Sequence, residues 1–309
     1  MINNTLLSRV ILCLLVIGGL QLPLSEALAN SSRTVEYFKQ EGDEAIERAL
    51  SADHPQKYLK QAIESYRRGL DLEEDNSYFL NELSRLYMAL AEAFASDRDS
   101  KLEAYQKGFE FGLESMRTCS EFDERYRNQG KKAFTDLPDS LTDLRAIYWT
   151  AANYGRLAEY SGVKKSLGDL PKLLAMNERV LELDEEYLGG AAHRSLAAIQ
   201  ASVLDKTPWS MTEVLKYDLS WTKVRTHLRQ ATELAPDCLA NYYTYAKYYS
   251  LKRGDKQAAK KHLLKVFREP IGEDYPFLNL FAKWDTIELW KEKWGELPED
   301  FSDDHPQVP

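Results

Sequence analysis

Four side chains near the middle of the sequence recur at helical spacing and could together form a binding site. Trp149, Asn153, Arg156 and Tyr160 follow at steps of four, three and four residues, which places them on one face of a helix. An indole, an amide, a guanidinium and a phenol are costly to bury without partners, and a solvated face seldom carries a tryptophan. A partly wet pocket accommodates all four, because small-ligand sites combine aromatic walls with a few polar groups. The alternative, equally open from the pattern, is that Trp149 packs under a loop and Arg156 pairs with a carboxylate.

Two further residues are second choices for the same pocket. Tyr148 lies on the neighbouring stripe with Ala151, Ala152 and Gly155, whose small size allows another helix to approach closely. His193 follows a glycine pair that we expect to open a helix. A lone histidine in a helix is more often a structural residue than a ligand or a base, so that interpretation also stays open.

The sequence contains none of the motifs that mark common catalytic sites. It has no H-E-x-x-H, no G-x-S-x-G and no phosphate-binding loop, and no Cys–His cluster has the spacing of a zinc site. We therefore predict no catalytic residue, metal or cofactor, and regard an enzyme with an unrecognised site as the least favoured class. Cys119 and Cys238 could form a disulfide, but two separate thiols are the favoured interpretation.

The elements that position these residues are predicted to be helices. From Tyr58 to Leu72 and from Tyr78 to Phe94, apolar residues recur at steps of three and four, and Asp75-Asn76 between them is a turn with a cap for the second helix. No segment shows the strict alternation of a strand. Two helices joined by so few residues must be antiparallel.

Internal repetition indicates the architecture. The segments from Tyr66 to Asn76, Asn177 to Tyr187 and Leu228 to Cys238 all end a helix with an acidic residue and Leu before a short turn, like the second helix of a tetratricopeptide repeat. The segment from Tyr248 to Phe267 looks like the other half, with Gly254-Asp255 as the tight turn. The spacing is irregular, so we predict an all-α, irregular tetratricopeptide-like array of helical hairpins. We expect one domain over residues 30–297 and a flexible tail over 298–309.

The first residues have the three-part pattern of a secretory signal peptide over residues 1–29. The apolar run from Val10 to Leu20 is too short to span a membrane, and an A-x-A site predicts cleavage after Ala29. Cys13 follows Leu12, whereas a lipidation site needs a small residue there, so no lipid anchor is expected. The prediction is a periplasmic protein, and its net charge of −9 argues against a nucleic-acid partner.

Two adjacent segments together resemble a known family. "LRAIYWTAANYGRLAEYSG" precedes "LPKLLAMNERVLELDEEYLGGAAHRSLAAI", and the order of Tyr148-Trp149, Arg179 to Tyr187 and Gly189 to His193 resembles the T-component (TatT) family associated with TRAP transporters. The resemblance implies an all-helical periplasmic protein without catalytic activity. It also implies association with the transporter's solute-binding protein and a trimer with an internal channel or cavity.

The predicted function is a non-catalytic component of a TRAP-type transport system. We expect it to bind a periplasmic solute-binding protein and a small organic ligand, the latter through the six residues Tyr148, Trp149, Asn153, Arg156, Tyr160 and His193. A homo-oligomer, a trimer by resemblance, is part of the same prediction. The alternative is a protein-interaction scaffold of the bacterial envelope that binds no ligand.

Overall fold

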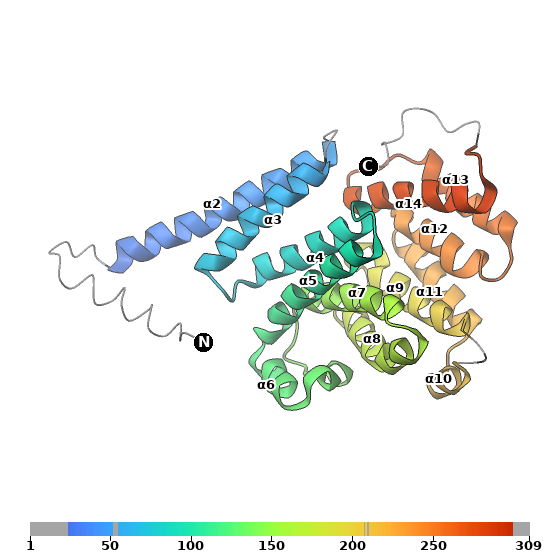
Figure 1. Ribbon diagram of the computed structural model, residues 1–309, viewed down its shortest axis with the longest axis horizontal. Coiled ribbons are helices and arrows are strands. Elements are labelled where there is room, and N and C mark those ends of the chain that lie inside the picture. Colours follow the sequence, from blue (N-terminus) through green and yellow to red (C-terminus); the bar gives the residue numbers. More distant parts are fainter. Residues whose placement is uncertain (1–23, 52–54, 207, 209, 299–309) are drawn as a thin grey trace.

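Every regular element in the computed structural model is a helix (Figure 1), for the residues that it describes: 24–51, 55–206, 208 and 210–298. The α-helices are α2 (Leu24–Ser51), α3 (Pro55–Leu72), α4 (Ser77–Ala93), α5 (Arg98–Arg117), α6 (Ser120–Gln129), α7 (Leu144–Tyr160), α8 (Val163–Leu183), α9 (Tyr187–Leu204), α10 (Met211–Lys216), α11 (Trp221–Leu234), α12 (Leu239–Tyr245), α13 (Lys256–Arg268) and α14 (Pro276–Trp294). A 3₁₀-helix, η1 (Gly130–Thr135), follows α6, and a π-helical turn, η2 (Ala246–Ser250), continues α12. The predicted all-α array of helical hairpins is confirmed.

Local signals in the sequence determine where several helices begin. The Asn76 side chain accepts hydrogen bonds from the backbone N–H groups of Tyr78 and Phe79, and so caps α4 as predicted. Asp143 caps α7 in the same way. Gly254, at φ +77°, makes the tight turn after η2, and Asp255 then caps α13.

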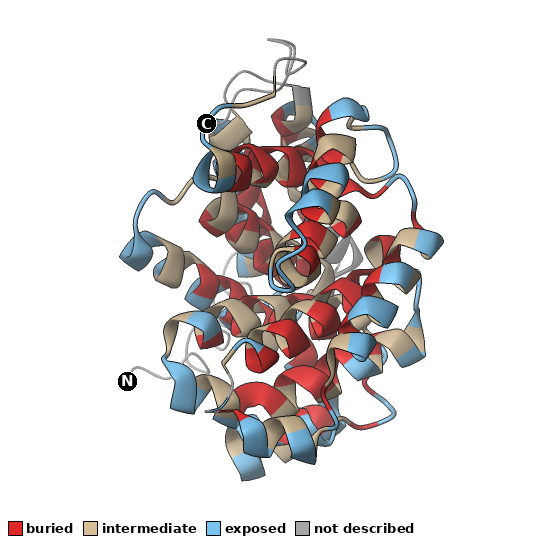
Figure 2. Cartoon of the chain, turned by 90° about the vertical axis from the view of Figure 1, so that its right-hand side faces the viewer, coloured by how far each residue is buried: buried red, intermediate tan, exposed pale blue. Residues whose placement is uncertain are grey.

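The hairpins follow one another in a curved array whose last helix returns to an early one. In Figure 1, α2 and α3 project as a pair from one end, α4, α5, α7 and α8 lie in the middle, and α11 to α14 form the other end. Each helix packs on its neighbours in this order, and α14 also contacts α4. Buried residues face inward along these helices (Figure 2). The curvature therefore encloses a space between α4, α7, α9 and α14.

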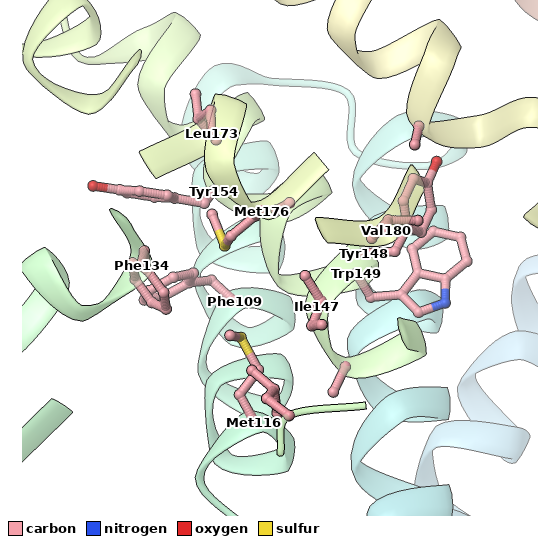
Figure 3. Packing of buried hydrophobic residues seen from close by; sticks show 14 of the residues in the cluster. Phe109, Met116, Phe134, Ile147, Tyr148, Trp149, Tyr154, Leu173, Met176 and Val180 are labelled. Atoms are coloured by element: carbon pink, nitrogen blue, oxygen red, sulfur yellow. The ribbon is translucent and has the colours of Figure 1, made fainter. Parts of the chain in front are cut away.

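The main apolar cluster surrounds α7. It joins residues of α5, η1, α7, α8 and α9, and includes Phe109, Phe134 and Tyr154 together with Tyr148 and Trp149 (Figure 3). Phe109 and Tyr154 have ring centroids 5.2 Å apart, and Phe134 lies beside both. This packing holds α7 rigidly against its neighbours, so the side chains on its other face have fixed positions.

Parts of the predicted domain organisation lie outside the described residues. These parts are residues 1–23 of the predicted signal peptide and 299–309 of the predicted tail, and α2 begins at Leu24, before the predicted cleavage site. The division into one domain therefore stays a prediction. Across the described part of the chain, no helix has the length and apolar character needed to cross a membrane. Cys119 is half-buried, Cys238 is buried, and both are free thiols.

Candidate functional site

A cavity of about 410 Å³ lies inside the curve of the array. Its wall is formed by α4, α7, α8, α9, α12 and α14, together with η2 and the segment that leads into α14. Along α7 the wall extends from Tyr148 to Glu159, a rise of about 16 Å at 1.5 Å per residue. Small-molecule sites have volumes of roughly 300–1,000 Å³. The cavity is thus large enough and long enough for an elongated organic molecule.

Apolar side chains make up most of the wall, and charged groups gather where α4, α7 and α14 meet. The apolar part includes Leu86, Leu170, Leu173, Ile199, Phe277 and Phe281. The charged part contains Glu92, Arg156, Glu159 and Asp285, and the wall also includes Arg85, Arg194, Lys206 and Asp274. An apolar length with a polar end is suited to an amphiphilic ligand.

Tyr148 and Trp149 belong both to the core and to the cavity wall. Each is 8% exposed, and their ring centroids lie 4.8 Å apart in an edge-to-face arrangement. Tyr148 also packs edge-on against Tyr187, at 5.5 Å. Figure 3 shows the two rings side by side, on the opposite side of the cluster from Phe134. The helix is therefore packed on one side and lines a cavity on the other.

Arg156 lies in the wall as part of an ion-pair network. Its Nε is 2.6 Å from Glu92 Oε1, its Nη1 donates to Glu159 Oε2 at 3.1 Å, and the Tyr105 hydroxyl donates to Glu92 at 2.9 Å. Burial by itself would lower the pKa of Arg156, but the two carboxylates outweigh it and raise this pKa. Arg156 therefore stays cationic, with both of its charge partners in the protein. The pairing of Arg156 with a carboxylate is the one that the alternative interpretation of the stripe gave.

Two other residues of the predicted stripe are placed outside the wall. Asn153 is fully buried, and its amide nitrogen donates to the Ser84 and Trp149 carbonyl oxygens at 3.1 and 2.9 Å. It closes the contact of α7 with α4 and α5. Tyr160 packs on Tyr105, with ring centroids 6.3 Å apart. Neither residue is among those that line the cavity.

His193 is also outside the wall. Its Nδ1 lies 2.8 Å from His227 Nδ1, and its Nε2 lies 2.9 Å from Glu185 Oε1. Burial, followed by the charges of His193 and Lys223, lowers the pKa of His227 to about 4. Within the described ranges, no group of three or more His, Cys, Asp or Glu side chains is arranged to hold a metal ion.

The turn before α9 adds a wall residue that sequence reasoning missed. Leu188, Gly189 and Gly190 all have positive φ, at 46°, 64° and 76°, so the right-handed part of α9 starts only after the glycines. Arg194 donates to the carbonyl oxygens of Leu188 and Gly189, at 2.9 and 2.7 Å, and to Asn241. The guanidinium thus satisfies the backbone groups that this turn exposes. The glycine pair was expected to open the helix, but both glycines lie in the left-handed turn that comes before its right-handed part. Nothing in the sequence marked Arg194.

The C-terminal helices add further residues that the sequence did not predict. Tyr243 on α12, Tyr248 on η2, and Phe281 and Asp285 on α14 all line the cavity. Burial and then the Glu92 charge raise the pKa of Asp285 to about 6, although Lys247 and Arg156 oppose this shift. One signal could have located Asp285, because it lies four residues after Phe281 on an otherwise apolar helix stripe.

Comparison with known proteins identifies the family. The sequence model of the TRAP transporter T-component matches residues 69–289, a range that starts in α3, ends in α14 and includes every residue of the cavity wall. No curated protein matches the sequence. The match covers well over half of the chain, and the protein belongs to the TRAP transporter T-component family.

Proposed function

We propose that this protein is a non-catalytic, periplasmic component of a TRAP transport system that holds a small organic ligand in the cavity and binds the transporter's solute-binding protein. Family membership supports the transport role. The observation that carries ligand binding is the 410 Å³ cavity, whose wall combines apolar length with a charged end. We retain Trp149 and Arg156 from the predicted stripe, and Tyr148 from the neighbouring one, as ligand contacts.

The paired state of Arg156 supports binding over catalysis. Its guanidinium is satisfied by Glu92 and Glu159, so it shapes the cavity and its charge balance without offering a free cation. Occupancy of such a site requires no bond to be broken. The proposal also includes binding of the transporter's solute-binding protein and assembly of this protein as a trimer.

Gly155 offers a way to fill the cavity without disturbing its wall. A Cβ atom built on Gly155 would have Leu173 Cδ2 as its nearest neighbour, at 3.8 Å, which is ordinary contact. Gly155→Leu should therefore place its side chain in the cavity and exclude the ligand. Gly155→Ala is the matched control, because it adds only the Cβ. Both variants should gain up to about 1 kcal/mol of helix propensity.

Native mass spectrometry of the protein extracted from its own cells tests the proposal. The wild type and Gly155→Ala should carry the same extra mass, and Gly155→Leu should lose it while the number of protein copies per complex stays the same. Retention of that mass by Gly155→Leu would refute the cavity as the site. A wild type that carries no ligand, but still captures a TRAP solute-binding protein, would favour the scaffold alternative.

A further inference from the structure

Asp285 is a carboxylate at the cavity wall without a protein partner. It is half-buried on α14, and across the described residues its oxygens accept no hydrogen bond and form no ion pair within 4.0 Å. Shielding a carboxylate from water costs free energy unless a cation or a hydrogen-bond donor pairs with it. Its position at the wall of an open volume means that a ligand group can supply the missing partner.

The neighbouring charged groups are already engaged. Arg156 is held by Glu92 and Glu159, and Glu92 also accepts from Tyr105. Lys247 Nζ donates to the Tyr243 hydroxyl at 3.0 Å. Lys247 keeps its positive charge, which together with that of Arg156 lowers the pKa of Asp285. In the described part of the chain, however, neither cation forms an ion pair with Asp285 within 4.0 Å, so the carboxylate has no cation in direct contact.

The surroundings of Asp285 suit a positively charged group. Tyr243, Tyr248 and Phe281 contribute aromatic side chains to the same wall. A carboxylate gives an ammonium a charge-assisted hydrogen bond, and aromatic faces attract cations. A ligand carboxylate would instead meet Asp285, Glu92 and Glu159, all of like charge.

We propose that the cavity selects an amphiphile with a protonated amine, which pairs with the Asp285 carboxylate while its apolar body extends along α7. This inference rests on the proposed ligand-binding function and adds the chemical class of the ligand. One counter-candidate is on the wall: Lys206, whose Nζ donates to Ser166 Oγ at 3.0 Å, could receive an anionic ligand instead.

The pH dependence of binding follows from the groups that face Asp285. These are Glu92 on α4, Arg156 on α7, Tyr243 on α12, Lys247 and Tyr248 beside it on η2, and Glu288 on α14. Burial, followed by the charge of Glu92, raises the pKa of Asp285 to about 6, and Lys247 and Arg156 oppose this rise. An ammonium binds the ionised carboxylate, so its affinity should rise about tenfold between pH 5 and pH 7.5 as Asp285 loses its proton. An anionic ligand should show the opposite trend.

Calorimetric titration with octylammonium, octanoate and 1-octanol at pH 7.5 tests the proposal. The three probes share an alkyl chain and differ in the end group. Octylammonium should bind at least about tenfold more tightly than the other two, because only its ammonium can donate a charge-assisted hydrogen bond to Asp285. Asp285→Asn should abolish this preference, and Glu288→Gln should keep it, because Glu288 is exposed one turn along the same helix.

The outcomes separate this inference from the proposed function. Tighter binding of octanoate, equal binding of all three probes, or no binding would each overturn the amine preference. The pH series on the wild type checks the same point without a variant whose folding could be impaired. If a ligand is still retained in native mass spectrometry, the cavity remains a ligand site and only its chemical class is wrong. Loss of octanoate binding in Lys206→Gln would then locate the anion.

Discussion

Gly189→Ala should destabilise the protein by roughly 3 kcal/mol, about twice the cost of Gly254→Ala. Both glycines have positive φ, at 64° and 77°. The two sites differ in what surrounds them. A Cβ atom on Gly189 would lie 3.0 Å from Ala235 Cβ, 3.1 Å from Cys238 Cβ and 3.2 Å from Tyr275 Cε1, whereas a Cβ atom on Gly254 would have no atom within 4 Å.

The magnitude follows from two separable costs. A left-handed conformation costs a residue with a Cβ roughly 1–2 kcal/mol, and both variants incur this cost. Extra volume forced into a packed site costs about 1–3 kcal/mol, and only Gly189→Ala incurs it, because Ala235 and Cys238 belong to the turn between α11 and α12. The difference between the two variants therefore measures how tightly the turn before α9 is packed.

Urea unfolding followed by helical circular dichroism gives the free energy of unfolding of each variant. A second measurement is local: in a Cys119→Ser background, Cys238 should react faster with a thiol reagent in Gly189→Ala than in Gly254→Ala. Cys238 is fully buried in the wild type. Equal destabilisation of the two variants, with no change in Cys238 reactivity, would refute the packing argument.

Two further predictions concern buried polar groups. Arg194→Met should cost about 3 kcal/mol in urea unfolding because the carbonyl oxygens of Leu188 and Gly189 lose their donors; a cost below about 1 kcal/mol would contradict this role. The pKa of His227 is lowered to about 4, below its ordinary 6.5, so its contribution to stability is complete above pH 6.5 and is lost as the pH falls towards 4. Between pH 7 and pH 5 the wild type should therefore lose about 2 kcal/mol more than His227→Gln does, and equal losses would contradict the shifted pKa.

The helices and their caps could be predicted because their signals are local. Asn76 and Gly254-Asp255 act on the backbone within a few residues, and the structure confirms both. The turn before α9 was foreseen only in part. A turn was expected at Tyr187 with the glycine pair opening the helix, but both glycines and Leu188 adopt positive φ, and no property of leucine indicates that.

The sequence predicted that α7 lines a pocket, but only Trp149 and Arg156 of the predicted stripe line the cavity. Tyr148, Ala152, Gly155, Arg156 and Glu159 line the cavity together with Trp149. Trp149 and Arg156 belong to the predicted stripe, whereas Tyr148, Ala152, Gly155 and Glu159 follow the stripe next to it. Because neighbouring stripes of a helix differ by little rotation, periodicity alone could not decide which one faced the cavity.

The residues from distant segments could not be placed from periodicity at all. Asp285 and Tyr248 reach the wall only because the array curves until α14 contacts α4 and because η2 changes the helical register after α12. Asn153 shows the converse. From the sequence, its polar side chain suggested a pocket residue. In the structure, its amide nitrogen instead donates to the buried carbonyl oxygens of Ser84 and Trp149.

The charged end of the cavity also explains why the walls do not collapse onto each other. Ala152 and Gly155 would let the facing helices approach, but closer packing would bury the Arg156–Glu92 pair. Removing both charges from water costs several kcal/mol per ion, more than a short stretch of alkyl contact returns. If the proposed function holds, a ligand gains affinity by filling the apolar length of the cavity, and it need not break the Arg156–Glu92 ion pair.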